Sequence, residues 1–420
     1  MKFLPELNIR NLLLGFQHVF AMFGATVLVP LITGLDVSTT LFCAGVGTLI
    51  FHFITKCKVP VFLGSSFAFL GGFAIVAPKL LDANGEATIP NLEKLPYACG
   101  GIVIAGLLYV LISIFIKIYG TKKILKFFPP VVTGPIIISI GLILAPSAIE
   151  NASKNWFLAI IALSVIIFCN VFAKGMLKII PILLAIIIST IVAYFIGEVD
   201  FSTLSNANFL GTPLNQNAFA KFDISAILTI VPIAIASMME HIGDIAAVSA
   251  TTEKNYFEDP GLDKTLLGDG IATSFAGLIG GPANTTYGEN TGVLAITRVY
   301  NPAILRLAAI FAIILSIIPK FDALINAIPI AIIGGISLIL YGMISAIGIR
   351  NLVENKIDLS NSRNLIIVAV ILVTSLGFSS INGITFNIFD INITLSGLAI
   401  ASILGIILNI VLPKEKEEIN

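Results

Sequence analysis

The sequence predicts an all-α polytopic membrane protein with fourteen membrane-spanning segments, arranged as a seven-plus-seven inverted repeat, with short antiparallel β pieces in segments 3 and 10. Three observations predict this class. Of 420 residues, 57% are hydrophobic and only 11% are charged, whereas a soluble globular chain carries about 25% charged residues. Long apolar runs alternate with short polar breaks. Features of the first half of the chain also recur in the second half.

Each predicted segment is an apolar run near the 20 or so residues that a helix needs to cross a bilayer. Polar, proline-rich and glycine-rich breaks separate these runs: 11–33, 37–56, 60–77, 97–118, 129–149, 155–173, 177–197, 225–247, 266–280, 288–300, 303–319, 324–347, 364–380 and 394–412. The run 60–77 and the region 280–300 are too short or too glycine-rich for plain helices. No small-residue cleavage site follows the start of the first run, so we expect a retained span and not a signal peptide.

The positive charges test the number of segments. With fourteen segments both ends of the chain lie on one side, and placing that side inside puts 19 Lys and Arg inside and 5 outside. Such an asymmetry is expected from the positive-inside rule. The long breaks assigned to the outside, 78–96 and 198–224, are polar and poor in positive charge. We therefore predict a multi-pass protein of the cell (inner or plasma) membrane, embedded in the lipid bilayer, with both termini cytoplasmic.

The second half repeats the first with inverted topology. Matching features are Pro129–Gly134 with Pro329–Gly334, Gln17-His18 with Glu240-His241, and the break 64–67 with the break 286–289. They fall in segments 5 and 12, 1 and 8, and 3 and 10. The shift of seven is odd, so the two halves are inverted. Inverted repeats with paired broken segments are typical of secondary transporters, and the broken segments mark the binding site.

Composition excludes several other functions. The formal net charge is zero, so no nucleic-acid partner is expected. The cysteines have no paired spacing and are expected to pack as small hydrophobic residues; they are Cys43, Cys57, Cys99 and Cys169. No glycine-rich nucleotide loop and no HExxH pattern occurs. We therefore expect no cofactor and no metal.

Four carboxylates stand inside apolar sequence: Glu240, Asp244, Asp269 and Glu289. A charge deep in a bilayer costs from about 2.5 to over 10 kcal/mol, so such residues are functional candidates by default. Glu240 and Asp244 are four residues apart and share a helix face, although they could also serve only a buried helix contact. His241 is turned by about 100° from Glu240 and is expected to face a neighbouring helix.

Asp269 lies between two glycines near the start of its predicted segment. We expect it to cap or pack the helix. Gly268 and Gly270 indicate that another backbone approaches closely at this point.

The most specific string in the chain runs from Gly280 to Arg298. Gly, Pro and Asn interrupt the helix before Glu289, and the Thr-Thr-Tyr that precedes Gly288 favours an extended piece. If the break 64–67 is similar, the two pieces can pair as a short antiparallel ribbon. Helices that begin after each break would direct their free N–H groups into a cavity.

This cavity is expected to suit a flat heterocycle. Backbone N–H groups of Phe67 and Gly288 are the expected donors. The carboxylates of Glu240 and Glu289 are the expected acceptors. A nucleobase dione presents the matching N–H and C=O groups, with ring or hydroxyl contacts expected from Tyr287, Tyr341 and Phe67.

No Arg or Lys is expected in the cavity, so an amino acid or a sugar suits it less well. Arg298, the nearest cation, is interpreted as an anchor at the inner end of its segment.

These residues carry a resemblance. The segment Glu289–Arg298, Glu-Asn-Thr-Gly followed by four residues and then Thr-Arg, resembles the signature of the nucleobase–ascorbate (nucleobase–cation symporter-2) transporter family. Gln17-His18, the Gly-Ser-Ser-Phe-Ala-Phe of segment 3 and the Met-Met-Glu-His-Ile-Gly-Asp of segment 8 are also similar to that family. The resemblance covers almost the whole chain. It is closest to bacterial uracil permeases, because Glu opens the signature and Ser65-Ser66-Phe67 fills the first break.

The resemblance implies a core domain and a gate domain. The core comprises 1–126 and 225–320 (segments 1–4 and 8–11). The gate comprises 127–197 and 321–420 (segments 5–7 and 12–14), and 198–224 form an outer loop. The family pattern also implies homodimerisation through the gate and secondary active import of uracil with a proton by alternating access.

The resemblance also implies roles for single residues. Glu240 and Glu289 would bind the base, and Phe67 and Gly288 would offer backbone N–H groups. Tyr341 would approach from the gate, beside Ser66 and Tyr287 at the breaks. Proton coupling is expected from Asp244, His241 and Glu289. Uracil members often carry His four residues after the segment-8 Glu, where this chain has Asp244.

Other functions stay open at this stage. A xanthine or urate carrier is disfavoured by the Glu that opens the signature. An anion exchanger or channel of related seven-plus-seven fold is opposed by the cavity carboxylates. A membrane enzyme is opposed by the lack of a nucleophile–base pair. Sodium could replace the proton as the coupling ion.

Overall fold

The computed structural model describes residues 3–413 except 82–84, 86, 201 and 389–390. The first half contains α1 (Ile9–Thr33), α2 (Val37–Ile54), β1 (Leu63–Ser65), η1 (Phe67–Phe69), α3 (Leu70–Val76), β2 (Leu80–Leu81), β3 (Ala87–Ile89), α4 (Leu95–Tyr119), α5 (Thr121–Leu125), α6 (Pro130–Ser153), α7 (Trp156–Val171), α8 (Met176–Ile179), α9 (Pro181–Phe195), α10 (Ser202–Asn206) and η2 (Gln216–Ala218).

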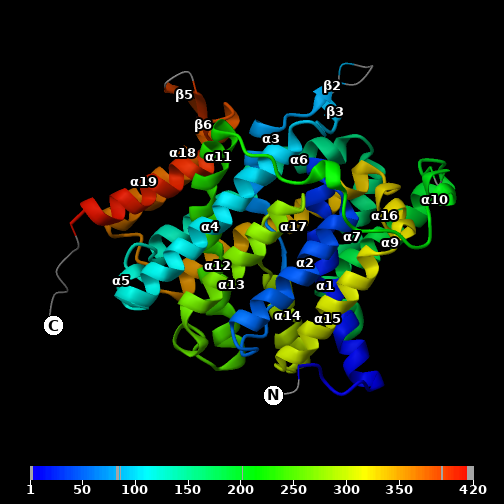
Figure 1. Ribbon diagram of the computed structural model, residues 1–420, viewed down its shortest axis with the longest axis horizontal. Coiled ribbons are helices and arrows are strands. Elements are labelled where there is room, and N and C mark those ends of the chain that lie inside the picture. Colours follow the sequence, from blue (N-terminus) through cyan, green and yellow to red (C-terminus); the bar gives the residue numbers. More distant parts are fainter. Residues whose placement is uncertain (1–2, 82–84, 86, 201, 389–390, 414–420) are drawn as a thin grey trace.

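The second half has a similar order of elements. It contains α11 (Ile224–Ile230), η3 (Val231–Ile233), α12 (Ala234–Thr252), η4 (Phe257–Gly261), α13 (Leu262–Leu278), β4 (Asn284–Thr286), α14 (Gly288–Thr297), α15 (Pro302–Ser316), α16 (Pro319–Asn326), α17 (Ile330–Glu354), α18 (Ser362–Ser380), β5 (Ile384–Ile388), β6 (Ile391–Leu395) and α19 (Gly397–Val411). The molecule is thus a bundle of helices (Figure 1).

Several helices have the length and composition of membrane spans. Seven of those in the described residues are long and apolar enough to cross a bilayer, or eight if α15 and α16, which meet at a bend of 84°, form one span. Shorter apolar helices of 10–17 residues include α7, α9 and α19. The protein is therefore a multi-pass membrane protein.

The two β hairpins lie at one edge of the bundle, opposite the N-terminal end of α1 (Figure 1). One is β2–β3 and the other is β5–β6, in which Ile384 pairs with Leu395. These two hairpins add to the β pieces that were predicted in segments 3 and 10. Residues 384–388 alternate apolar and polar side chains, which is the pattern of a strand. Moreover, the run predicted to begin at 394 becomes a helix only at Gly397.

Two predicted helix starts are also shifted. The segment predicted from 266 begins at Leu262. The segment predicted from 324 begins at Ile330, because α16 ends at Asn326 and Pro329 precedes the new helix. Proline is favoured just before or at the first position of a helix and disfavoured within it.

The strands β1 and β4 pair at the two predicted breaks. They are antiparallel, with Leu63 opposite Thr286 and Ser65 opposite Asn284. The pairing extends beyond both strands, since Ser66 N donates to Ala283 O (2.8 Å) and Tyr287 N donates to Phe62 O (3.1 Å). Every residue of the two strands is buried. Backbone polar groups in such a place must pair within the protein, and this ribbon satisfies them.

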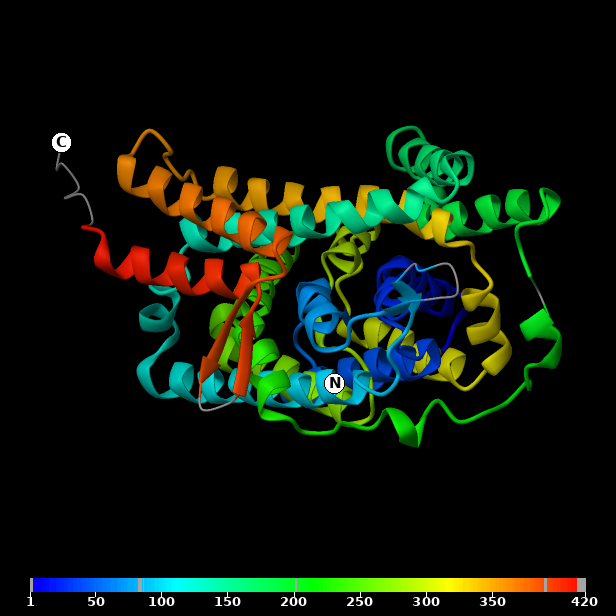
Figure 2. The ribbon, with the colours of Figure 1, turned by 90° about the horizontal axis from the view of Figure 1, so that it is seen from above.

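Close helix packing depends on small residues. A Cβ atom at Gly141 of α6 would collide with the backbone carbonyl of Tyr341 on α17, and one at Gly270 of α13 would lie 2.7 Å from the carbonyl oxygen of Gly106 on α4. The second contact agrees with the close approach predicted at Gly270. The view turned by 90° shows α6 and α17 lying along each other (Figure 2). Small residues at such contacts let apolar helices approach closely.

Candidate functional site

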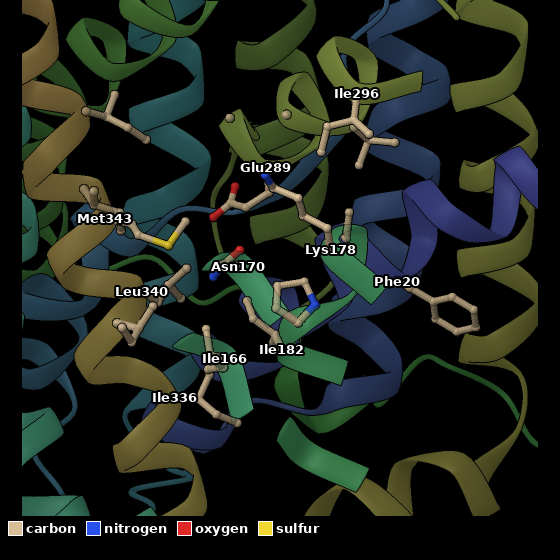
Figure 3. Close-up of a pocket in the computed structure, with 18 residues that line it drawn as sticks. Phe20, Ile166, Asn170, Lys178, Ile182, Glu289, Ile296, Ile336, Leu340 and Met343 are labelled. Atoms are coloured by element: carbon tan, nitrogen blue, oxygen red, sulfur yellow. The ribbon is translucent and has the colours of Figure 1, made fainter. Parts of the chain in front are cut away.

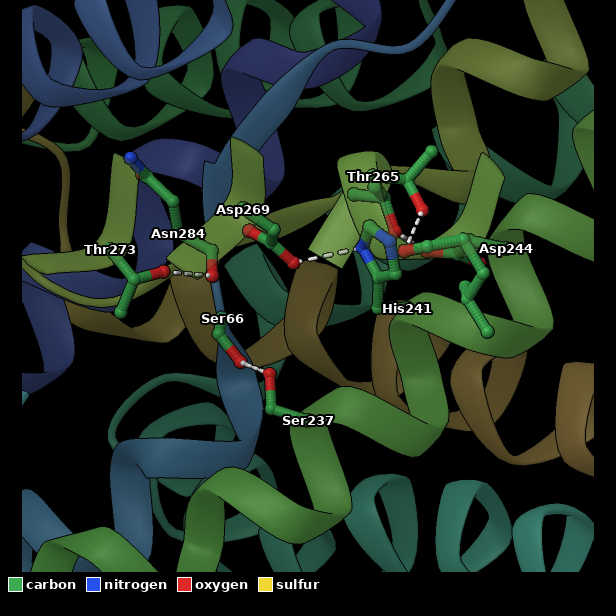
Figure 4. Close-up of polar contacts among 10 residues, drawn as sticks. Ser66, Ser237, His241, Asp244, Thr265, Asp269, Thr273 and Asn284 are labelled. Carbon is green, nitrogen blue, oxygen red and sulfur yellow. Dashed lines mark hydrogen bonds and ion pairs between the residues drawn. The ribbon is translucent and has the colours of Figure 1, made fainter. Parts of the chain in front are cut away.

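The ribbon β1–β4 is held in place by side chains of the surrounding helices. Thr48 on α2 accepts a hydrogen bond from Leu63 N at 2.9 Å. Thr273 on α13 donates to the carbonyl oxygen of Asn284 at 3.0 Å (Figure 4). Asn284 in turn donates to the carbonyl oxygens of Cys43 and Ala272, each at 3.3 Å. The ribbon is therefore a rigid platform inside the bundle.

Two short helical pieces begin directly after this platform. The 3₁₀ turn η1 starts at Phe67, and α14 starts at Gly288. The first N–H groups of a helix have no partner within it and carry partial positive charge. Phe67 and Gly288 are thus located where free backbone donors are expected.

Asp244 of α12 faces the second break, and Glu240 lies one helical turn before it. Asp244 Oδ2 accepts a hydrogen bond from Thr286 Oγ1 at 2.7 Å, and Asp244 Oδ1 lies 3.6 Å from the position that a Cβ atom of Gly288 would occupy. Glu240 Oε2 is buried and has no hydrogen-bond partner among the described residues. Buried polar atoms of native proteins are nearly always paired, so this oxygen is available to a ligand.

His241 and Asp269 form a buried pair between α12 and α13. Their Nδ1 and Oδ2 atoms lie 2.9 Å apart, and neither side chain is exposed (Figure 4). His241 therefore faces a neighbouring helix, as predicted. Asp269 does not cap a helix, because α13 begins at Leu262; it lies inside α13 and contacts α12 through His241.

Ser66 connects the first break to α12. Its hydroxyl lies 3.2 Å from that of Ser237, and its side chain is buried (Figure 4). Ser237 precedes Glu240 by three residues, so the two lie on adjacent turns of one helix face. The contact between Ser66 and Ser237 therefore joins the first break to the part of α12 that carries Glu240.

Phe67 meets α17 through its ring. The rings of Phe67 and Tyr341 lie edge to face, with centroids 5.7 Å apart and planes at 74°. This is a favoured aromatic geometry. The Tyr341 hydroxyl is buried without a hydrogen-bond partner among the described residues. Phe67 and Tyr341, which were predicted to reach the site from distant segments, are therefore neighbours.

Tyr287 supports the ribbon from within. Its hydroxyl donates to Ser65 O at 3.0 Å and lies 3.4 Å from Thr26 Oγ1. A Cβ atom at Gly64 would collide with its ring. Because the Tyr287 hydroxyl is already engaged, the geometry favours a positioning role over direct contact with a ligand.

Asn290 is a residue whose role the sequence alone did not predict. Its Nδ2 atom lies 3.1 Å from both Nδ1 and the carbonyl oxygen of His18 on α1. This contact ties the helix that carries Glu289 to α1. The signal was present in the sequence, since Asn290 follows Glu289 in the signature and His18 belongs to a repeated pair.

A cavity of about 230 Å³ opens beside Glu289 (Figure 3). Its lining comes from α1, α7, α8, α9, α14 and α17 and includes Gly288 and Glu289, but among the described residues it does not include Glu240, Phe67 or Tyr341. Most of the lining is apolar. Small-molecule sites commonly combine an apolar wall with a few polar groups in this way.

The cavity also contains a cation that was not predicted. Lys178 and Asn170 line it together with Glu289, and all three side chains point into it (Figure 3). The expectation that no Lys would lie in the cavity is therefore wrong. The charge pattern places Lys178 on the inside, near the start of the seventh predicted segment. In the structure it belongs to α8, and the packing of this helix places it in the same cavity lining as Glu289.

The comparisons with known proteins agree with this architecture. The uracil permease of Bacillus subtilis is 40% identical over 96% of this chain and 93% of its own length. A probable uracil permease of Haemophilus influenzae is 40% identical over 98% and 96%. The uracil permease of Escherichia coli K12 is 37% identical over 96% and 91%.

Two solved structures share the fold. They are the transmembrane domain of the cyanobacterial bicarbonate transporter BicA (TM-score 0.65, 16% identity, covering 90% of this chain and 98% of that one) and SLC26A9 (TM-score 0.67, 11% identity, covering 96% and 64%). At such identities the likeness concerns the fold alone.

The family model Xan_ur_permease, described as the permease family, matches residues 10–384. The match covers most of the chain, and the relatives at about 40% identity over nearly its full length are named uracil permeases. The sequence prediction of a transporter and not an enzyme is therefore confirmed. The chain belongs to this permease family, the nucleobase–ascorbate transporters that its signature resembles.

Proposed function

We propose that the protein is a secondary active transporter that imports uracil, or a closely related nucleobase, with a proton by alternating access. The observation that carries the proposal is the Glu289 carboxylate at the broken, strand-paired segment, together with the unpaired carboxylate oxygen of Glu240 on α12. Glu240 has an oxygen without a partner, and Glu289 stands at the start of α14 facing a cavity. The names of the relatives, uracil permeases, agree with this substrate.

Base recognition would use both breaks. Uracil carries two N–H donors and two C=O acceptors on a flat ring. We assign the N–H groups to the carboxylates of Glu240 and Glu289, and the C=O groups to the backbone N–H groups of Phe67 and Gly288. Hydrogen bonds to charged groups are the stronger ones, so the carboxylates would supply most of the specificity.

The remaining site residues would shape and close the site. Tyr341 would cover the base from the gate, next to Phe67, which its ring already contacts. Ser66 would position α12, and Tyr287 would position the ribbon. Their existing hydrogen bonds support these secondary roles.

Proton coupling would reside in the cluster Glu240, Asp244 and Glu289. Three negative charges close together in an apolar environment repel one another strongly, so uptake of a proton would accompany binding of a neutral base. Asp244 is a candidate carrier because it contacts the second break through Thr286. His241 would act indirectly, through its pairing with Asp269.

Alternating access would come from a core and a gate domain built of fourteen segments in inverted repeats. Contacts between α6 and α17 support this symmetry. Gly134 of α6 packs against Gly348 of α17, and Gly334 of α17 packs against Ala152 of α6. Such nearly reciprocal contacts are expected of two equivalent helices related by a pseudo-twofold axis.

The protein would lie in the inner or plasma membrane of the cell, with both termini in the cytoplasm. The cavity beside Glu289 includes Lys178, a residue of the positively charged side, which supports an inward-facing state. We further propose a homodimer through the gate domain. Crosslinking of cysteine pairs introduced on α18, a helix that is only 22% buried, would test it.

The decisive experiment is uptake of labelled uracil in a permease-null cell, with and without a protonophore. We expect uptake that the protonophore abolishes and that excess xanthine does not reduce. Sodium-dependent uptake that resists the protonophore would contradict proton coupling. Absence of uracil uptake, together with chloride or bicarbonate flux in proteoliposomes, would contradict the substrate.

A further inference from the structure

The cavity beside Glu289 lies between the two proposed domains. Glu289 belongs to α14 of the core, whereas Lys178 belongs to α8, between the gate helices α7 and α9. Among the described residues of its lining, these two are the only charged side chains, and they have opposite sign. Asn170 of α7 is their polar neighbour (Figure 3).

Lys178 is exposed and Glu289 is partly buried, so water at the open side of the cavity screens part of their attraction, and the apolar lining screens it less than bulk water would. The other titratable groups near Glu289 cannot act as a counter-charge. Glu240 and Asp244 of α12 are acids, and they interact unfavourably with Glu289. His18 of α1 is buried and bonded to Asn290. Tyr341 is the titratable residue that α17 brings to the site.

His241 is also excluded as the counter-charge of Glu289, since it is paired with Asp269 between α12 and α13. Lys178 is thus the positive charge in the cavity that can compensate a negative one on Glu289.

We propose that Lys178 is the gate-side counter-charge of Glu289, and that it promotes release of the transported proton into the cytoplasm. The inference rests on the proposed proton-coupled import. After the base and the proton have left, the carboxylate cluster at Glu289 would carry its full negative charge beside this cavity. The Lys178 ammonium group, which lines the same cavity as Glu289 in this structure, would stabilise that negative charge and so favour loss of the proton.

The chain contains a matched control. Lys174 lies four residues before Lys178, and both side chains are exposed, but Lys174 is not among the residues that line the cavity. Both lysines would satisfy the positive-inside rule equally well. A role as a simple membrane anchor therefore predicts the same effect for both, and the counter-charge predicts an effect for Lys178 alone.

The test uses the full-length protein in proteoliposomes, with two assays on Lys178→Met, Lys178→Arg and Lys174→Met. Net uptake of labelled uracil driven by a proton gradient requires proton release inside. Exchange of external for internal uracil does not require it. We expect Lys178→Met to lose about tenfold in net uptake, the size of one charge-assisted interaction, and to keep its exchange rate. Lys178→Arg and Lys174→Met should match the wild type.

A second readout separates this role from a structural one. Raising the internal pH from neutral to alkaline should bring net uptake by Lys178→Met closer to that of the wild type. A low internal proton concentration favours loss of the proton even without the positive charge of Lys178. An equal loss of exchange and net uptake, an equal effect of Lys174→Met, or no recovery at alkaline internal pH would overturn the proposal. Failure of the wild type itself to show proton-driven uptake would instead overturn the proposed function.

Discussion

The two breaks of the chain have similar backbones and different chemistry. The first runs from β1 through the turn Phe67–Phe69 to α3, and the second runs from β4 directly into α14. The first contains no charged residue, whereas the second places Glu289 in the first turn of its helix. A repeated fold thus supplies two helix N-termini, and the sequence leaves the first uncharged and gives the second a carboxylate.

The largest expected effect tests the charge of the second break. Glu289→Gln keeps the size of the side chain but removes the anionic acceptor. We expect uracil uptake to fall at least about a hundredfold, because a base N–H would lose a charge-assisted bond in a buried site. Uptake of labelled uracil, normalised to protein in the membrane, measures it. Glu354→Gln, at an exposed acid that pairs with Arg350, is the control and should retain full uptake.

The next prediction separates the two acids of α12, which lie one helical turn apart. Glu240→Gln should abolish binding of labelled uracil to the purified protein, since the free Oε2 atom is its proposed contact. Asp244→Asn should retain binding, because its partner is Thr286, and should instead change how uptake depends on external pH. Equal loss of binding in both variants would show that the two acids share one role.

A third prediction tests the rigidity of the first break. Gly64→Ala should reduce both uptake and thermal stability, because the new methyl group would collide with the ring of Tyr287. Overpacking of this kind costs about 1–3 kcal/mol. Gly71→Ala is the matched control, since no atom lies within 4 Å of the added carbon. The measurement is the melting temperature of each variant in detergent. Equal melting temperatures for the two variants would contradict close packing of Gly64 against the ring of Tyr287.

A fourth prediction concerns the support of the second break. Asn290→Ala removes the hydrogen bonds to His18 that tie α14 to α1. Leaving buried partners unsatisfied costs about 1–3 kcal/mol, so we expect a several-fold loss of uracil affinity with the protein still folded. His18→Ala should give a similar loss, and the double variant should lose little more than either single one. Additive losses would contradict a shared contact.

The smallest effect is expected far from both breaks. Lys58 and Asp259 form an exposed ion pair at 2.5 Å, and the hydrogen bond from Lys58 lowers the pKa of Asp259. Exposed pairs of this kind contribute little to stability. Asp259→Asn should therefore leave the melting temperature and uracil uptake within experimental error, at low and at high salt. A clear loss of uptake would indicate that this loop takes part in transport.

Much of the architecture could be predicted from local sequence signals. The described helices follow the predicted apolar runs closely, because hydropathy and helix-breaking residues act within a few turns. The extended pieces at Gly64 and Thr286 were indicated by Gly, Ser and Thr in otherwise apolar segments. The hairpin β5–β6 was missed, since all of it except residues 394–395 lies in the break between the last two predicted segments, to which no structure was assigned.

The sequence by itself determined which residues are costly to bury and where the helices break, because both follow from the chemistry of the residues concerned and their neighbours. Only the tertiary structure decided the partners. It fixed the register of β1 against β4, and it paired His241 with Asp269 and Phe67 with Tyr341. It also placed Lys178 in the lining of the cavity beside Glu289. These contacts join distant segments, and they arise from how whole helices pack, which local patterns do not encode.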